Sequence, residues 1–584
     1  MSYARNTRGA TLLDTLVGIS LMLLVFVGIT AVFKLSVEVV TNNKARTGAL
    51  ALAQERMEYI RSLSYSDVGT LGGVPAGNIT QTESVSLNGV SYIRRTVILY
   101  VDDPKDGEGV NDENGIITDY KQVKVTLSWS TQSGARSTNL ISRVSPPGIE
   151  QEVPGGVLRV TVLDASVSPV ASADVRIIND STDPVIDTTV LTNTQGVAML
   201  VGAPEATDYE IVVSKTGYST SQTHDTSVGN PNPSPGHLTV VEDSTTASTF
   251  SIDVVSEKIV QTFRRIEEAV WDDSFNDSSK IASTASTTIS SGSLSLESSA
   301  TVGTAQSISV APSYLYSWNT LYWESVEPVG SSATFRLYYI GGSGPEIIPE
   351  ENLPGNAAGF TASPVDISNL STTIYPVLII HTTLIGEGGV TDPEVEEYHV
   401  SYDSGPIPLP NIAFSMRGSK TIGTDGTGVA IYKYDENLSS GASASYSSQT
   451  IEWDTYIVEV DGSAIGYDIA ESCDPQPKSI NPNTSVTTKL YLADHTTNSL
   501  RVNVVNDSGA LLEDAQVRLY RGAYDETTTT SNCGGTFFNA LSAGTGAGGD
   551  VYSLDVILAG YDSITAQSTD VSGASVISVV LTEI

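Results

Sequence analysis

Residues 8–33 read RGATLLDTLVGISLMLLVFVGITAVF, and this stretch decides how the chain begins. The part from Ala10 to Phe33 holds 24 residues, and its one charged side chain is Asp14. Such a run is long enough to cross a bilayer as an α-helix. A lone carboxylate inside a spanning helix costs several kcal/mol unless it has a partner, so Asp14 is a functional candidate on physical grounds alone.

The nine residues before this run are polar, with Arg5 and Arg8 and no acid. Their positive charge predicts a cytoplasmic N-terminus. A secretory signal peptide has its small-residue cleavage site after the apolar run. Here the plausible site, Gly9-Ala10, lies before the run, which indicates a different kind of processing.

The order Gly9, Ala10 and Asp14 resembles the prepilin peptidase site of type IV pilins, in which a glycine precedes the first mature residue and an acid stands fifth. The family usually has Phe first and Glu fifth, so Ala10 and Asp14 depart from its pattern. The resemblance implies cleavage after Gly9 and N-methylation of Ala10. It also implies that Asp14 neutralises the free amine of a neighbouring subunit during filament assembly.

Helical spacing continues beyond Phe33 to Leu63. The apolar residues that recur at this spacing are Leu35, Val39, Ala49, Leu52, Ala53, Met57, Ile60 and Leu63. The pattern predicts one helix over residues 10–63, about 80 Å long at 1.5 Å per residue. Its first part, residues 10–33, is the predicted membrane span after a leader of residues 1–9, and its second part would cross a β-sheet.

Charge and composition limit what the rest of the chain can do. Net charge is −37, and because residues 1–63 carry +3, the remaining 23 basic and 63 acidic residues carry −40. A body this acidic repels nucleic acid, since it cannot neutralise phosphates. At 584 residues the chain is too long for one hydrophobic core, so several domains are expected.

Residues 64–148 alternate apolar and polar side chains in four segments, which predicts antiparallel strands packed on the helix. In the resemblance to pilins, this is the α+β roll. The acidic segment within it offers oxygen ligands for calcium, and the candidates are Asp102, Asp103, Asp106, Asp112, Asn114 and Asp119. Their spacing does not match an EF-hand, and a solvated hairpin rich in turn residues is the alternative.

An internal repeat follows. Residues 158–180 (LRVTVLDASVSPVASADVRIIND) align with residues 500–522 (LRVNVVNDSGALLEDAQVRLYRG). Each copy ends in a Gly-Tyr pair, at Gly217-Tyr218 and Gly560-Tyr561, and a looser third copy ends at Gly466-Tyr467. The copies resemble the carboxypeptidase regulatory-like domain, a non-catalytic, transthyretin-like β-sandwich. The resemblance implies three such domains, at residues 155–256, 406–496 and 497–584.

The chain has two cysteines, Cys473 in the second copy and Cys533 in the third. Because the compartment is expected to be oxidising, a disulfide between the two domains is one interpretation, and two free thiols are the other.

Residues 257–405 alternate apolar and polar side chains in segments separated by turn residues, and this pattern predicts a jelly-roll-like sandwich. Its aromatic residues could form a platform for a surface glycan, or they are core residues instead. They are Tyr314, Tyr316, Trp318, Tyr322 and Trp323.

No catalytic motif is found in the sequence, and the five histidines stand apart from one another, so we expect a protein that is not an enzyme. They are His224, His237, His381, His399 and His495. Lone histidines are usually structural. No cofactor is expected other than candidate calcium.

The sequence therefore predicts a mainly β protein with one long N-terminal α-helix: a pilin roll followed by transthyretin-like and jelly-roll-like sandwiches. By resemblance it is a minor type IV pilin, processed by prepilin peptidase. It would be a single-pass protein of the cytoplasmic membrane before it assembles with other pilins, and an extracellular adhesin afterwards. The alternatives are a pseudopilin of a secretion or DNA-uptake apparatus and, less favoured, a glycan-processing enzyme on a pilin anchor.

Overall fold

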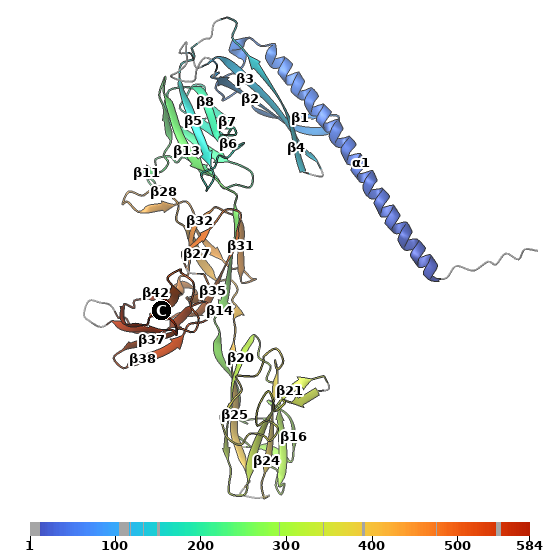
Figure 1. The fold of residues 1–584 in the computed structure, drawn as a ribbon, viewed down its shortest axis with the longest axis vertical. Helices are drawn as coiled ribbons and strands as arrows, with labels where there is room; N and C mark the ends of the chain where they lie inside the picture. Colours follow the sequence, from blue (N-terminus) through green and yellow to red (C-terminus); the bar gives the residue numbers. More distant parts are fainter. Residues whose placement is uncertain are drawn as a thin grey trace, which may run out of the picture.

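A computed structural model describes residues 12–103, 105, 116, 118–131, 134–148, 152–290, 292–342, 344–387, 392–474, 476–544 and 551–584. The protein is mainly β, with 53% of residues in strands and 9% in helices. Figure 1 shows one long helix that leans away from a row of β-domains. The row ends in two separate domains, one at the far end and one at the side.

The helix α1 (Leu12–Arg61) packs its C-terminal half on an antiparallel sheet. The sheet has the order β1 (Thr82–Leu87), β2 (Val90–Val101), β3 (Tyr120–Thr131) and β4 (Gly134–Val144). Buried residues of the helix pack on buried residues of the sheet in one core, which includes Ala45, Ala49, Ala53, Met57, Ile60, Val123, Val125 and Leu127. The small alanines let the helix approach the sheet closely, which fixes where it crosses the strands.

The first module (residues 156–251) is a sandwich of two sheets. One sheet holds β5 (Gly156–Leu163), β8 (Val197–Ala203) and β13 (Thr245–Ser251). The other holds β6 (Asp174–Asn179), β7 (Ile186–Leu191), β9 (Ala206–Ser214), β10 (Ser221–Gln222) and β12 (Leu238–Val240). The first strand, β5, runs parallel to the last strand, β13, and antiparallel to β8.

This strand pairing occurs twice more. The middle module has β14 (Ser256–Arg264), β27 (Ala413–Gly418), β30 (Asp435–Ser439), β31 (Ser445–Ile451), β32 (Asp454–Glu459), β33 (Tyr467–Ser472), β34 (Lys478–Ile480) and β35 (Ser485–Asp494). The C-terminal module has β36 (Ser499–Asn506), β37 (Gln516–Arg521), β38 (Tyr524–Thr529), β39 (Gly535–Phe538), β40 (Tyr552–Ile557), β41 (Ile564–Thr569) and β42 (Ala574–Leu581). In both, the first strand is again parallel to the last, β14 to β35 and β36 to β42.

The predicted boundaries of the middle module are wrong, because its first strand lies outside the predicted residues 406–496. The sequence pattern places most of β14 in the sandwich of residues 257–405, but the strand pairs with β35 and β31. Its alternation of buried and partly exposed residues is that of any half-buried strand, so the sequence holds no sign of which core it joins. The second copy of the repeat matches the other two less closely in sequence, because residues 267–404 are inserted after its first strand.

The inserted domain (residues 267–404) is itself a two-sheet sandwich. One sheet contains β15 (Glu267–Asp273), β17 (Thr287–Ser290), β18 (Ser293–Leu296), β20 (Leu315–Val326), β23 (Val365–Asp366) and β25 (Glu394–Ser404). The other contains β16 (Ile281–Ala285), β19 (Val302–Ser307), β21 (Ser332–Gly341), β22 (Gly344–Ile347) and β24 (Leu378–Ile385). Figure 1 places this domain at the end of the row farthest from the sheet that packs on α1, and the C-terminal module at the side of the row.

Each joint along the row is bridged by specific contacts. Arg95 of β2 forms an ion pair with Asp174 of the first module at 3.0 Å. A hairpin of the middle module, β28 (Thr421–Thr424) and β29 (Ala430–Tyr432), pairs with β11 (Asn232–Pro233) of the first module. At the inserted domain, β26 (Ile407–Pro408) pairs with the end of β14. These contacts hold neighbouring domains in defined orientations.

Candidate functional site

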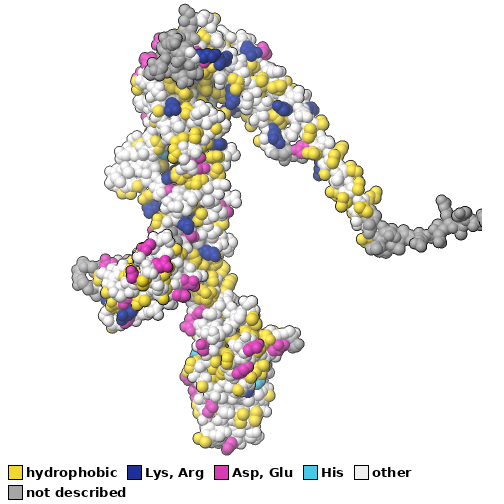
Figure 2. Space-filling view, in the orientation of Figure 1, with side chains coloured by type: hydrophobic (Ala, Val, Ile, Leu, Met, Phe, Trp, Pro, Cys, Tyr) yellow, Lys and Arg dark blue, Asp and Glu magenta, His cyan; other side chains and the backbone are white. Residues whose placement is uncertain are grey.

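The N-terminal half of α1 exposes apolar side chains on all of its faces. The large apolar residues described between positions 16 and 40 are about half exposed or more. These residues are Leu16, Ile19, Leu21, Met22, Leu23, Leu24, Val25, Phe26, Val27, Ile29, Val32, Phe33, Leu35, Val37, Val39 and Val40. Figure 2 shows this part of the helix as a mostly hydrophobic surface that stands away from the β-domains. A helix that is apolar all round belongs in lipid or among other helices.

Three hydroxyl groups within this part of the helix already have hydrogen-bond acceptors in the helix itself. The hydroxyls of Ser20, Thr30 and Ser36 each donate to the carbonyl four residues earlier, at 2.8–2.9 Å. Among the described residues, one helix is long and apolar enough to cross a membrane, with its candidate segment beginning at Ile19. Internally bonded hydroxyls suit that surrounding, because hydrocarbon offers them no partner.

The predicted processing site lies at the edge of what the structure describes. Gly9 and Ala10 are outside the described residues. Asp14 belongs to α1, but its side chain is also outside them. Cleavage, methylation and the assembly role of Asp14 therefore stay predictions.

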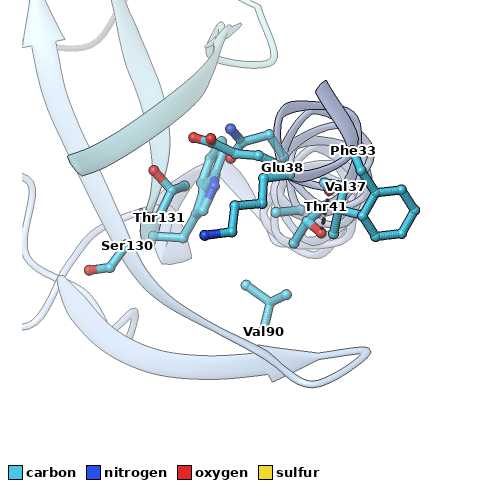
Figure 3. A pocket seen from close by; sticks show the side chains of 11 residues that line it. Phe33, Val37, Glu38, Thr41, Val90, Ser130 and Thr131 are labelled. Atoms are coloured by element: carbon cyan, nitrogen blue, oxygen red, sulfur yellow. Dashed lines mark hydrogen bonds between the residues drawn. The ribbon is translucent and has the colours of Figure 1, made fainter. Parts of the chain in front are cut away.

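A groove of 730 Å³ lies where α1 leaves the sheet. Figure 3 shows Phe33, Val37, Glu38 and Thr41 on the helix and Val90, Ser130 and Thr131 on the strands beside it. The indole N–H of Trp129, which also lines the groove, is buried and has no acceptor in the part of the chain that the structure describes. Trp129 thus contributes a buried donor beside the groove that lacks an acceptor among the described residues.

Sequence reasoning missed this groove. Its walls come from residues 33–45 of the helix and from two strands, and only packing of the sheet on the helix brings them together. The one local signal is Glu38, an acid within a mostly apolar part of the helix.

The calcium candidates are only partly described. Asp106, Asp112 and Asn114 lie outside the described residues. The backbone N–H of Asp103 donates to the Asp119 carboxylate, and Asp103 also pairs with Arg143 at 3.3 Å. Asp102 lies beside them in sequence.

Over the described ranges, no group of three His, Cys, Asp or Glu side chains is placed to hold a metal ion. What the structure brings together is thus a pair of carboxylates with an arginine, and calcium stays a prediction.

The two cysteines are joined in the structure as a disulfide, with their Cα atoms 4.4 Å apart. Cys473 follows β33 of the middle module, and Cys533 precedes β39 of the C-terminal module. Beside the bond, the Ser531 hydroxyl donates to the Glu471 carboxylate, and burial raises the pKa of Glu471. The bond therefore links the two modules at a packed junction.

The predicted aromatic platform is not formed. Trp318 is fully buried and its indole N–H donates to the Tyr375 carbonyl at 2.8 Å, and Trp323 is 4% exposed. Tyr314 and Tyr316 are exposed, at 54% and 56%. The two tryptophans belong to the core of the sandwich, whereas Tyr314 and Tyr316 lie at the surface, so the four rings do not share one exposed face.

Three of the five histidines lie apart with partners of their own, whereas His224 forms a β-bridge with Gly236 and lies close enough to His237 for that residue to help lower its pKa, after burial and Lys433. His495 pairs with Asp468 at 2.9 Å, and His399 stacks on Tyr322 with ring centres 4.5 Å apart. His381 packs on Tyr338, and burial lowers its pKa. Such contacts are typical of histidines with a structural role. That the protein is not an enzyme stays an expectation.

Comparison with known proteins gives distant structural neighbours. No family profile and no curated protein matches the chain. Among solved structures, the Bacillus anthracis TIE protein matches at 12% identity over 87% of this chain and 74% of its own, with a TM-score of 0.16.

Two pilins are also among the neighbours. The major pilin subunit of Bacillus cereus matches at 8% identity over 74% of this chain and all of its own, with a TM-score of 0.13. The minor pilin of Streptococcus agalactiae matches at 11% over 30% of this chain and 84% of its own, also with a TM-score of 0.13. Scores this low do not establish a common fold.

Proposed function

We propose that this chain is a minor pilin-like subunit of the type IV kind, which assembles through α1 and displays its β-domains at the cell surface. The observation that carries the proposal is the division of α1 into two halves. Its C-terminal half is packed on a sheet, whereas its N-terminal half exposes apolar residues all round. A helix built in this way can lie in a membrane and later exchange lipid for the helices of other subunits.

In this proposal, prepilin peptidase cleaves after Gly9, Ala10 becomes N-methylated, and Asp14 pairs with the amine of a neighbouring subunit. The chain has no catalytic role. The row of sandwiches is a non-enzymatic stalk, and the inserted domain, which lies at the end of the row away from the sheet that packs on α1 (Figure 1), is the part presented to a surface ligand.

The size of the body supports a sparse or tip position. Some 430 residues follow position 150, and Figure 2 shows them extending far beyond the helix and its sheet. A body of these dimensions on every subunit would crowd a repeating filament wall.

The test is the mature N-terminus, read by mass spectrometry from the wild-type chain and from Gly9→Val. We expect a chain that begins at N-methyl-Ala10, and an uncleaved chain in the variant. Gly28→Val is the matched control, because a Cβ at Gly28 meets nothing within 4 Å. An intact Met1 in the wild type, or a cut beyond Phe33, would exclude the proposal.

Asp14→Asn separates processing from assembly. It should be cleaved and methylated like the wild type but be lost from sheared filaments. Labelled filaments would support the pilus role, whereas a secretion defect in cells without filaments would favour a pseudopilin.

A further inference from the structure

A crevice between the middle and C-terminal modules contains two buried hydrogen-bond donors without an acceptor. Its volume is 540 Å³, within the range of about 300–1,000 Å³ that small-molecule sites have. Residues of both modules line it, and those used below are Glu459, Asp461, Asp468, Gln476, Arg501 and Phe537. The crevice exists only where the two modules meet.

Arg501 is the first donor. It lies on β36, between Phe537 of β39 and Val576 of β42. Its Nε is buried without an acceptor, and no ion pair of its side chain is found among the described residues. Burial lowers the pKa of Arg501. Burying a charge without a partner is costly, so this position favours a partner that comes from outside the chain.

Gln476 is the second donor. Its Oε1 accepts the backbone N–H of Val458 at 3.1 Å, which fixes the orientation of the side-chain amide. The Nε2 group is then the free end, and it is buried without an acceptor over the described part of the chain. A guanidinium and an amide N–H in one crevice are suited to a carboxylate, which accepts several hydrogen bonds.

The acidic residues of the crevice limit the charge of the ligand. Asp468 is engaged by His495 at 2.9 Å and by Ser499 at 3.2 Å, and Asp461 caps the short helix α2 (Gly462–Ile465). Together with Glu459, these carboxylates disfavour a ligand that carries a second negative charge beside its own carboxylate. Their remaining lone pairs can accept hydrogen bonds from neutral hydroxyl groups.

We propose that this crevice binds a ligand that has one carboxylate on a hydroxyl-bearing ring, the chemistry of a uronic acid. Arg501 and Gln476 hold the carboxylate, and Glu459 and Asp461 accept hydrogen bonds from ring hydroxyls. Phe537 and other apolar residues of the crevice wall pack against the ring. The site does not depend on filament assembly, because it involves no part of α1.

The experiment uses the full chain in detergent micelles, titrated with glucuronate and with glucose by calorimetry. Glucuronate should bind, and glucose should bind at least about tenfold more weakly, because it lacks the group that makes charge-assisted bonds. Arg501→Gln should weaken the binding of glucuronate by about tenfold or more. Arg518→Gln is the matched control, since Arg518 lies in the same module, pairs with Asp525 at 2.6 Å and does not line the crevice.

Three results would overturn the proposal. They are no binding of glucuronate, equal binding by Arg501→Gln, and binding of N-acetyl-aspartate amide as tight as that of glucuronate. A thermal scan of Arg501→Gln checks folding. Its midpoint should be unchanged or higher, because a partly buried charge that has no ion pair among the described residues is removed, and a lower midpoint would assign Arg501 to the module junction instead.

Discussion

The guanidinium of Arg264, the last residue of β14, contacts the carboxylate of Asp494, the last residue of β35, at 2.9 Å. The Nε of the same side chain contacts Glu267, the first residue of β15, also at 2.9 Å. One arginine thus joins both parallel strands of the middle module to the start of the inserted domain.

Arg264→Gln should loosen the inserted domain while leaving the middle module folded. Because these pairs are partly exposed, the expected loss of unfolding free energy is about 1 kcal/mol or less. The spread of angles between the two domains in electron micrographs should widen. Arg176→Gln, which removes an exposed pair inside the first module, should leave the spread unchanged, and equal spreads in both variants would contradict the prediction.

Gly48→Ala should weaken the packing of α1 on its sheet. A Cβ at Gly48 would lie 2.6 Å from the Tyr92 hydroxyl, which donates to the Ala45 carbonyl at 2.9 Å. Tyr92 must move and lose this bond, at a cost of about 1–3 kcal/mol. Chemical denaturation of the full chain measures this loss of unfolding free energy. Gly28→Ala adds the same methyl group in open space and should cost nothing.

Lys258 should make the stability of the middle module depend on pH. Burial lowers the pKa of Lys258 from 10.5 to about 8, and its ammonium donates to Thr488 at 2.6 Å. The folded chain releases this proton at a lower pH than the unfolded chain, so the free energy of unfolding contains a contribution that rises between pH 8 and 10.5. Below pH 8 both states are protonated and the contribution is flat.

Calorimetry between pH 8 and 10, below the ordinary pKa of tyrosine, checks this slope. Lys258→Met should reduce it for the middle module. Lys489→Met, at an exposed position next to Thr488 on β35, should retain it. A slope unaffected by Lys258→Met would show that other groups cause it.

Removal of the disulfide should destabilise the junction of the middle and C-terminal modules. The bond closes a loop between residues 60 apart, and such bonds contribute about 2–4 kcal/mol. The double variant Cys473→Ser, Cys533→Ser should show faster hydrogen exchange in β33 and β39 than the wild type. Reductant should produce the same change in the wild type and none in the variant.

Features that depend on local spacing could be predicted from the sequence. The end of α1 at Arg61 lies two residues from the predicted end, because the apolar stripe stops there. The repeat found in residues 158–180 and 500–522 corresponds to equivalent strands, β5 and β6 in one module and β36 and β37 in the other.

Features that depend on contacts between distant segments could not be predicted. Strand β14 has no residue that distinguishes the middle module from the inserted domain, and its partner β35 follows more than two hundred residues later. Likewise, Gln476 and Arg501 are ordinary surface residues by sequence. Only the packing of two modules brings both into one crevice.

The insertion also decides how a mechanical pull on the far end would travel to the membrane. The chain enters the middle module at Ser256 and leaves it at Arg264, so tension runs along β14 from one end to the other. A strand is already extended, at about 3.3 Å per residue. Its covalent backbone therefore bears the load, and the middle module need not unfold to transmit it.

The first module meets the same load differently. Tension would enter at the start of β5 and leave at the end of β13, and these parallel strands would be pulled past each other. The backbone hydrogen bonds that join them would then resist together, in shear. The C-terminal module, attached beyond β35, lies outside this path and can keep its junction with the middle module undisturbed while the stalk is stretched.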